Sequence, residues 1–175
     1  TGGRAMSETR TRIRRHIERD PGIHFRALTR RLELATGQVQ YHLARLDDVT
    51  EERVSGRTHY YPPGYDAWER TVLAMLRRET VRDVVAVLYD GGEARPDAVA
   101  DRVGIARSTL EHHLDGLVAG DIVAKHREGN RVTLSLVRPD ETVALLGAVE
   151  PGLAERLTDR FERLVANLLV EPRRD

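Results

Sequence analysis

The strongest constraint on the fold of this chain is an internal repeat, because the sequence matches itself when it is shifted by 71 residues. Small and apolar residues meet small and apolar residues at each aligned core position across residues 27–46, without a gap. The motif His-Leu-x-x-Leu recurs at the same place, starting at His42 and at His113. Such a period indicates that one structural unit occurs twice along the chain. The aligned pairs are Ala27 with Ala98, Leu28 with Val99, Leu32 with Val103, Leu34 with Ile105, Ala35 with Ala106, Val39 with Leu110, Leu43 with Leu114 and Leu46 with Leu117.

The first copy predicts three helices followed by a hairpin. Apolar residues recur at steps of three and four, which is the helical period. Pro21 and Gly22 end the first helix, because proline lacks the N–H that a helix needs and glycine relaxes the chain. Ser55-Gly56-Arg57 favours a turn between two short strands. The predicted elements are helices around Ile13 and Ile17, over Phe25–Leu32 and over Thr36–Asp47, and strands over Glu52–Val54 and Thr58–Tyr61.

The second copy predicts the same order of elements. Pro96 and Gly104 bracket a short helix, since proline is favoured at the first helical position and glycine just past the end. Gly129 is the hairpin glycine and aligns with Gly56 after a two-residue insertion. The predicted elements are helices lined by Trp68–Leu76 and Val81–Leu88, helices over Pro96–Val103 and Arg107–Val118, and strands over Ile122–His126 and Arg131–Leu136.

A third segment differs from both copies. Pro139 starts a short helix, and Pro151 starts a longer one that runs to about Val170. Apolar residues occupy one broad face of the longer helix, while Glu, Asp and Arg occupy the other. The helix either packs onto its own domain or pairs with a second copy of the chain, as terminal helices of symmetric dimers commonly do. In the second interpretation, which we favour, the dimerisation residues are Leu153, Leu157, Phe161, Leu164 and Leu168.

Composition narrows the class of protein. The chain has 175 residues and no Cys, which excludes a disulfide framework, a Cys-based zinc finger, an iron–sulfur cluster and a thiol nucleophile. The longest apolar run, Val84–Tyr89, is far shorter than the roughly 18–20 residues that cross a bilayer. No apolar run follows the N-terminus, as it would in a signal peptide. We therefore expect a cytoplasmic protein that has no membrane partner.

The distribution of charge points to an anionic partner for the N-terminal third. The chain as a whole carries 28 Lys and Arg against 28 Asp and Glu. Residues 1–62, however, hold 12 Arg against 8 acidic residues, and residues 63–175 hold 15 Arg and one Lys against 20 acidic residues. Arg remains charged at any working pH and binds phosphate with two hydrogen bonds. A codon or lineage bias explains the preference for Arg over Lys equally well, but the local excess of charge favours an anionic ligand.

The predicted helix over Thr36–Asp47 is suited to a groove of DNA. Val39, Leu43 and Leu46 occupy its inner face, so its polar side chains face outward. The major groove of B-DNA admits one helix, in which Gln pairs with adenine and Arg with guanine. The outward residues are Gln38, Gln40, Tyr41 and Arg45; the preceding helix adds Arg26, Arg30 and Arg31 for phosphates, and the hairpin adds Arg57 and His59.

These segments resemble a known family. Phe25–Leu46 followed by Arg53–Tyr61 resembles the winged helix-turn-helix domain of archaeal and bacterial transcriptional regulators of the ArsR/MarR/IclR type. Thr36–Leu43 is similar to the start of their recognition helix, and Tyr60-Tyr61-Pro62 matches the aromatic residues that close the wing. Gly104–Leu114 in the second copy resembles the recognition element still more closely. The resemblance covers about two-thirds of the chain and implies contacts with DNA from the recognition helix, Thr36 included.

The repeat and the resemblance together define the expected architecture. The fold class is mainly α with small β-wings (α+β): two tandem winged helix-turn-helix domains followed by C-terminal amphipathic helices. We expect an N-terminal winged domain over residues 1–64, a linker helix and second winged domain over residues 65–138, and a helical dimerisation segment over residues 139–175.

Two features depart from the family pattern. Ala35 and Ala106 stand at helix caps where the family usually has Ser or Thr, and an Ala cap costs about 1 kcal/mol. Residues 47–52 include four carboxylates that would repel phosphates at an interface, so we expect them on the far side of the turn.

The second copy is less basic than the first. Asp97, Asp101 and Glu111 oppose contact with phosphate, so this copy either reads DNA weakly or has become a structural or dimerising unit. We expect the first copy to be the main DNA-binding unit. The candidate DNA-binding residues of the second copy are Arg107, Ser108, Thr109, His112, Arg127 and Arg131.

Catalysis and metal binding find no support in the sequence. It lacks a Gly-x-Ser-x-Gly elbow, a phosphate-cradling glycine loop and a His-Glu-x-x-His motif. His112 and His113 are adjacent and point about 100° apart on a helix, so they cannot both bind one ion well. We expect no enzymatic activity, no catalytic residue, no metal and no cofactor.

The sequence thus predicts a sequence-selective DNA-binding transcriptional regulator or nucleoid-associated protein, acting on double-stranded DNA as a homodimer. The alternative is a tandem winged-helix scaffold that binds proteins, which the acidic second half favours. Exposed apolar residues on the recognition helices would support that alternative, but Gln and Arg stand there instead. The sequence does not determine the operator, the sense of regulation or any small-molecule effector.

Overall fold

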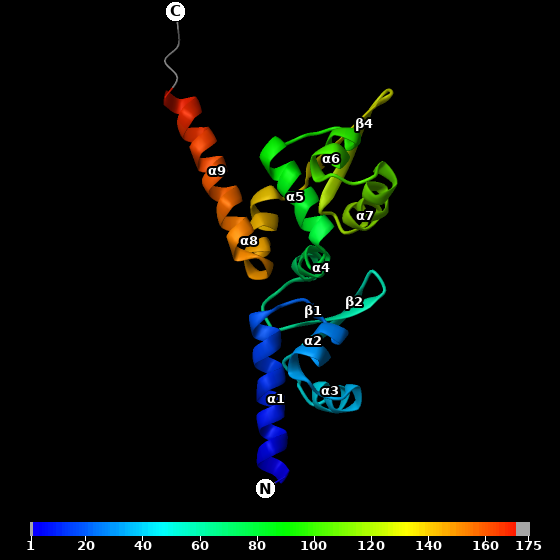
Figure 1. Cartoon of the computed structure of the whole chain (residues 1–175), viewed down its shortest axis with the longest axis vertical. Coiled ribbons are helices and arrows are strands. Elements are labelled where there is room, and N and C mark those ends of the chain that lie inside the picture. The colour runs from blue at the N-terminus through cyan, green and yellow to red at the C-terminus, as the bar shows by residue number, and fades with distance from the viewer. Residues whose placement is uncertain (1, 171–175) are drawn as a thin grey trace, which may run out of the picture. The chain divides into compact units, whose positions relative to one another are not determined.

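The computed structural model describes residues 2–170, which form helices and two small sheets (Figure 1). It divides into two compact units, Thr1–Arg77 and Arg78–Asp175, called unit 1 and unit 2 below. Residue 1 of the expected segment 1–64 and residues 171–175 of the expected segment 139–175 lie outside the described residues. The predicted fold class, mainly α with small antiparallel wings, is confirmed. No described helix combines the length and the apolar character needed to span a bilayer.

Unit 1 has the predicted order of three helices and a hairpin. Its strands form an antiparallel sheet in the order β1-β3-β2. Ser55 and Gly56 connect β2 and β3, and both have positive φ, as a two-residue type I′ turn requires. The elements are α1 (Gly2–Arg19), β1 (Ile23–His24), α2 (Phe25–Leu32), α3 (Thr36–Leu43), β2 (Thr50–Val54), β3 (Arg57–Tyr61) and α4 (Ala67–Leu76).

One apolar cluster holds α1, α2, α3 and the sheet of unit 1 together. Ile13 and Ile17 of α1 both face inward, since they are separated by about one helical turn. Tyr60 of β3 brings the wing into the same cluster. Burial of each large apolar side chain contributes roughly 1.5–3 kcal/mol, so these contacts fix how α3 sits on its neighbours. The buried members are Ile13, Ile17, Ile23, Ala27, Leu28, Leu32, Val39, Leu46 and Tyr60.

Two details of unit 1 differ from the sequence prediction. Helix α3 ends at Leu43 instead of continuing to Asp47, because the chain tightens into i→i+3 bonds. Leu46 N donates to Leu43 O at 3.1 Å, and this tighter turn places Leu46 in the core. The two-residue strand β1, which the sequence pattern does not predict, pairs with β3 and adds a third strand to the wing.

Helix α4 belongs to unit 1, although the sequence pattern assigns it to the second domain. Leu73 packs against Gly22, where an added Cβ would lie 3.2 Å from the Leu73 Cβ and where φ is 82°. Both the close approach and the positive φ favour glycine at that position. Arg77, just past α4, lies 3.8 Å from the Asp20 carboxylate. These long-range contacts place the division after Arg77 rather than after residue 64.

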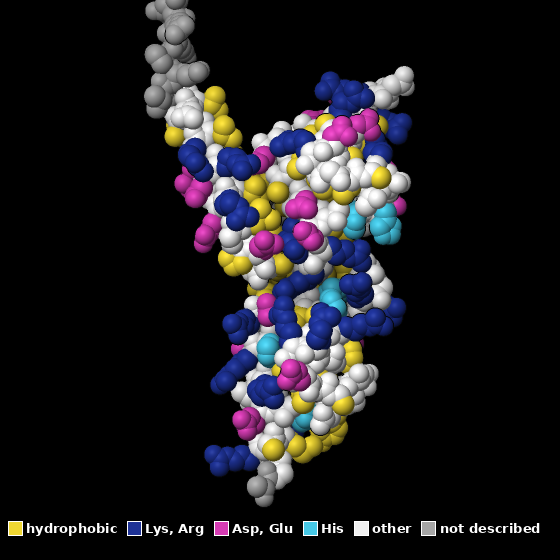
Figure 2. All heavy atoms as spheres, in the orientation of Figure 1, with side chains coloured by type: hydrophobic (Ala, Val, Ile, Leu, Met, Phe, Trp, Pro, Cys, Tyr) yellow, Lys and Arg dark blue, Asp and Glu magenta, His cyan; other side chains and the backbone are white. Residues whose placement is uncertain are grey.

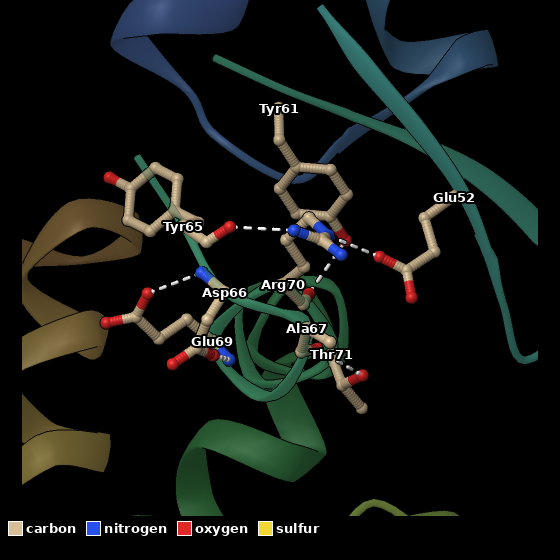
Figure 3. A network of polar contacts seen from close by, with 8 residues as sticks. All are labelled: Glu52, Tyr61, Tyr65, Asp66, Ala67, Glu69, Arg70 and Thr71. Carbon is tan, nitrogen blue, oxygen red and sulfur yellow. Dashed lines mark hydrogen bonds and ion pairs between the residues drawn. The ribbon is translucent and has the colours of Figure 1, made fainter. Parts of the chain in front are cut away.

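Arg70 connects α4 to the wing (Figure 3). Its Nε donates to Glu52 Oε2 on β2 at 2.6 Å, and its Nη1 donates to Tyr65 O at 2.7 Å. Its own carbonyl accepts a hydrogen bond from the Tyr61 hydroxyl at 2.7 Å. One side chain and one carbonyl therefore hold a wing strand, the connection after the wing, and α4 in a fixed arrangement.

Unit 2 has the predicted sequence of helices, hairpin and C-terminal helices. Its two strands pair antiparallel, from Val123 with Leu136 to Glu128 with Arg131. Leu110, Leu114 and Leu117 are the buried residues of its third helix. The elements are α5 (Glu79–Gly91), α6 (Pro96–Val103), α7 (Arg107–Ala119), β4 (Val123–Glu128), β5 (Arg131–Leu136), α8 (Pro139–Val149) and α9 (Pro151–Val170).

Helices α2 and α6 occupy matching places in the two units. Both are eight residues long and start 71 residues apart. Each is followed at the same place by a residue in the left-handed conformation, Glu33 with φ 54° and Gly104 with φ 80°. The next helix then begins after an extended alanine, Ala35 or Ala106.

Helix α9 packs on its own unit over its first half and exposes apolar residues over its second. Leu157 is 3% exposed, and the Phe161 ring lies 5.9 Å from the Tyr89 ring on α5. Leu164 and Leu168 are 50% and 75% exposed. The expected dimerisation stripe is therefore corrected at Leu157, which contributes to the interior of unit 2.

Candidate nucleic-acid interface

A concave surface of about 900 Å³ lies on unit 1 between α2, α3 and the β2–β3 wing. Figure 2 shows Lys and Arg side chains in dark blue gathered over this unit. Four residues of the sequence prediction line the surface together: Arg26, Arg30, Gln40 and Arg57. The arrangement presents three guanidinium groups and one amide to a single concavity, which is a suitable chemistry for a phosphate backbone and a base edge.

Helix α2 points its two arginines outward because its other side is apolar. Leu28 and Leu32 are buried, so Arg26 and Arg30 lie on the opposite, exposed side. The helix is capped by His24, whose Nδ1 accepts the Ala27 N–H at 3.3 Å.

His24 also lines the concave surface. Burial lowers the pKa of its imidazole, and the cations Arg57 and Arg30 together with His59 lower it further. This direction is expected for an imidazole that is partly buried and lies near arginines.

Helix α3 presents a polar outer face. Val39 and His42 are buried, while Thr36, Gln40 and Tyr41 are exposed. Its N-terminus has Ala35 instead of a capping Ser or Thr. The amide Oε1 of Gln38 reaches back and accepts the Ala35 N–H at 3.2 Å, which partly compensates for the missing side-chain cap. The Gln38 side chain is therefore exposed and also stabilises the start of α3 through this hydrogen bond.

Arg45 lies past the end of α3 and folds back along it. Its Nη1 donates to Tyr41 O at 2.9 Å. Both side chains are exposed, and neither of them lines the concave surface.

The wing residues differ in their accessibility. Arg57 is exposed directly after the hairpin turn. His59 is 4% exposed, and its Nδ1 lies 2.7 Å from Gly22 O, so its side chain faces inward. This corrects its inclusion among residues available to DNA, because β1 pairs with β3 at this position, His24 with His59, and the side chain is covered.

Arg31 and two of the carboxylates of residues 47–52 form ion pairs. Arg31 bonds Asp20 Oδ2 at 2.5 Å and is not part of the concave surface. Of the four carboxylates in residues 47–52, Asp48 pairs with Arg14 at 2.9 Å and Glu52 with Arg70 at 2.6 Å. Glu51, in contrast, lines the concave surface, so not all of the acidic residues lie on the far side.

The candidate residues of unit 2 are accessible, but one of them is paired with carboxylates. Ser108, Thr109 and His112 are exposed on α7. Arg107 donates to Asp97 Oδ1 at 2.5 Å and to Glu111 Oε1 at 2.6 Å. The hydrogen bond that Arg107 donates to Glu111 lowers the pKa of the Glu111 carboxyl and raises the pKa of Arg107.

The wing arginines of unit 2 are exposed on the β4–β5 hairpin, Arg127 near its end and Arg131 just after its turn. Arg131 lines a depression together with Glu93, Glu128 and His126. This wing therefore presents mixed charge, unlike the arginine-lined wing side of unit 1.

Several residues of the concave surface are not predicted from the sequence. His24, Thr58 and Tyr60 line the concavity beside the arginines. The signal for His24 is its position directly before the second helix, where a capping residue is expected. Burial, followed by Glu51, raises the pKa of Tyr60 to about 12, so its hydroxyl stays protonated.

Within residues 2–170, no group of three His, Asp or Glu side chains has a geometry that would hold a metal ion.

Comparison with known proteins identifies the unit that carries this surface. Residues 7–73 match a family described as an N-terminal HTH domain. This segment is a helix-turn-helix domain. The match spans α2, α3 and the whole wing, so the helix-turn-helix domain contains the complete concave surface. The predicted resemblance to helix-turn-helix transcriptional regulators is confirmed.

A longer similarity extends beyond the helix-turn-helix domain. Over 130 residues the chain is 26% identical to an uncharacterized HTH-type transcriptional regulator of Methanocaldococcus jannaschii. The aligned region covers 73% of this chain and 33% of that protein, so the chain spans about a third of the length of the relative it matches.

Proposed function

We propose that this protein is a sequence-selective, DNA-binding transcriptional regulator that places α3 of unit 1 in the major groove of double-stranded DNA. The observation that carries the proposal is the convergence of Arg26, Arg30, Arg57 and Gln40 on one concave surface of the helix-turn-helix domain. The similarity to a protein named as a transcriptional regulator supports the same function.

The outer face of α3 has the shape that insertion into a groove requires. Gly37 and Ala44 are exposed and small, so the helix backbone can approach the floor of the groove. Gln40 and Arg45 are exposed on either side of Tyr41 and have the donors and acceptors that read adenine and guanine. The major groove, about 12 Å wide, accommodates a helix with such side chains.

Phosphate contacts supply the sequence-independent part of the affinity. Arg26 and Arg30 on α2 and Arg57 on the wing flank α3, which places cations where the two strands of a duplex would pass. Each neutralised phosphate releases counterions. A plot of the logarithm of the binding constant against the logarithm of salt concentration therefore has a slope that is more negative by about 0.9 for each phosphate contact.

The proposal includes a homodimer that acts in the cytoplasm and on the nucleoid. The exposed residues Phe161, Leu164 and Leu168 form an apolar stripe at the outer half of α9. Apolar stripes at terminal helices are commonly covered by a symmetry-related copy. A dimer would also bring two helix-turn-helix domains to one duplex.

The second candidate function is a scaffold that binds protein. It is favoured by α7, where the Arg107 guanidinium is paired with carboxylates instead of being free for phosphate. It ranks second because Gln40 on α3 and Arg45 just past its end are exposed in unit 1.

Selection of bound fragments from genomic DNA at two salt concentrations tests the proposal with the full chain. We expect recovery of a common sequence and a steep loss of binding at the higher salt concentration. Replacing Arg26 and Arg30 with Ala should weaken binding to all sequences, while Gln40→Ala should cost about 1–3 kcal/mol of preference at particular bases. Arg31→Ala is the matched control on the same helix, since Arg31 is paired with Asp20. Capture of a stoichiometric protein partner without any retention of DNA would reverse the ranking.

A further inference from the structure

Unit 2 reverses the charge at the positions that line the DNA-binding surface of unit 1. At the offset of 71 residues, Arg26 and Arg30 of α2 correspond to Asp97 and Asp101 of α6. Gln40 of α3 corresponds to Glu111 of α7 by the same offset. Because α2 and α6 have matching bounds and matching ends, these residues occupy equivalent places in their units.

Two of these acidic residues, Asp97 and Glu111, belong to one ion-pair network. Arg107, at the start of α7, lies 2.5 Å from Asp97 on α6 and 2.6 Å from Glu111 one turn further on. Lys125 of β4 lies 3.2 Å from the other oxygen of Glu111. The network therefore connects α6, α7 and the first wing strand, the same three kinds of element that border the concave surface in unit 1.

This network makes the surface formed by α6, α7 and β4 unsuited to binding phosphate. Exposed ion pairs are individually weak, so their strength alone would not keep a duplex away. The sign of the charge does so, because Asp97, Asp101 and Glu111 outnumber the cations Arg107 and Lys125 on this face. An approaching phosphate would have to displace carboxylates from Arg107 and would then lie among three acidic side chains.

We propose that the two winged units have different roles: unit 1 alone contacts the duplex, and unit 2, with its internally neutralised α7, serves as the support for α8 and α9. The proposal rests on the proposed function of unit 1. It follows from the reversal of charge at matching positions and from the pairing of Arg107, the one Arg among the exposed candidates of α7. The packing of Phe161 and Arg160 of α9 against Tyr89 and Asp90 of α5 gives unit 2 its supporting role.

The dependence of DNA binding on salt tests the proposal, with the full chain and a fluorescent duplex of mixed sequence as the probe. In R107A/E111A one charge of each sign is removed, so the net charge stays the same. We expect the slope of log affinity against log salt to equal that of the wild type. In R26A/R30A the slope should become shallower by about 2, because two phosphate contacts are lost. A decrease of about 1 in R107A/E111A would show that Arg107 contacts phosphate and would overturn the proposal.

A gain of function provides the complementary test. The variant D97R/D101R/E111Q gives unit 2 the charges of unit 1, and we expect its slope to become steeper by about 1–2 as new phosphate contacts form. An unchanged slope in this variant, with circular dichroism showing a folded chain, would overturn the inference that the reversed charge is what keeps unit 2 off the duplex. If the wild type binds no duplex at low salt, the proposed function of unit 1 fails as well, which distinguishes that outcome from a failure of this inference alone.

Discussion

The guanidinium carbon of Arg45 lies 3.6 Å from the centroid of the Tyr41 ring, so the two side chains are stacked at the exposed edge of α3. The same guanidinium donates to the Tyr41 carbonyl at 2.9 Å. Because α3 ends at Leu43, regular helical backbone does not hold Arg45 in place, and its direction depends on these two contacts. In the proposed complex, Tyr41 therefore acts as a positioning residue for Arg45.

Replacing Tyr41 with Leu should weaken discrimination at the base that Arg45 contacts, while leaving affinity for mixed-sequence DNA almost unchanged. The cation–π contact contributes about 0.5–1 kcal/mol at an exposed site, and the loss of preference should be of that size. Competition between the selected site and a site altered at one guanine measures it. Tyr41→Phe keeps the ring and should keep the preference. Equal losses in the Leu and Phe variants would assign the effect to the hydroxyl instead of the stack.

The left-handed residue after α2 offers a stabilising substitution. Glu33 has φ 54° and ψ 37°, a conformation that costs a residue with a Cβ roughly 1 kcal/mol. Glu33→Gly should therefore raise the free energy of unfolding by up to about 1 kcal/mol, as measured by urea denaturation. Glu33→Gln removes the charge but keeps the Cβ, so it should give no such gain.

The matching position in unit 2 provides the reciprocal experiment. An added Cβ at Gly104 would have no atom within 4 Å, so any effect of Gly104→Ala comes from its φ of 80°. We expect Gly104→Ala to destabilise the protein by about 1 kcal/mol. A neutral result at both positions would contradict the conformational explanation.

Two histidines at matching positions, His42 buried and His113 half-buried, should make stability fall in mild acid. Burial lowers the pKa of both imidazoles. Arg10 and Arg45 lower the pKa of His42 further, and His112 followed by Arg78 lowers that of His113. The unfolded chain, with an ordinary pKa of about 6.5, therefore takes up protons first as the pH falls. Stability is complete above about pH 6.5 and is lost as the pH falls through the lower folded pKa values.

Thermal unfolding of the double variant His42→Leu/His113→Leu measures this contribution. The variant should lose less Tm than the wild type between about pH 7 and pH 5. His126→Leu, at an exposed position on the wing of unit 2, is the control and should behave like the wild type. An equal fall of Tm in the double variant and the wild type would show that other groups cause the acid sensitivity.

The exposed half of α9 should determine the oligomeric state. Leu164 and Leu168 are 50% and 75% exposed, whereas Leu157 is buried in unit 2. Leu164→Glu/Leu168→Glu should convert a dimer into a monomer without loss of helical circular dichroism, because the substituted side chains do not contribute to the interior. Sedimentation equilibrium gives the mass of each form, with Glu162→Gln on the same helix as the control. A monomeric wild type would contradict the proposed dimer.

Local patterns in the sequence predict the helices of this protein well. The bounds of α2 and α6 agree with the predicted Phe25–Leu32 and Pro96–Val103, since apolar periodicity, proline at the start and a break at the end act within a few residues. The exposed side of α3 is predicted for the same reason, because Val39 and its neighbours at helical spacing fix which residues face outward.

Other features depend on contacts between residues far apart in the sequence. The burial of His59 follows from β1 pairing with β3 and from the Gly22 carbonyl 2.7 Å from its ring nitrogen. Alternation in one strand cannot show that both of its faces are covered.

By itself, the sequence determined the repeated order of elements, the amphipathic faces and the basic character of the N-terminal third, because periodicity, caps and charge are local properties. Only the tertiary structure decided that Arg26, Arg30, Arg57 and Gln40 share one concavity while Arg107 is paired with Asp97 and Glu111. Whether charged side chains converge or form ion pairs depends on the distances between residues of three different elements. The packing of side chains throughout the unit sets those distances.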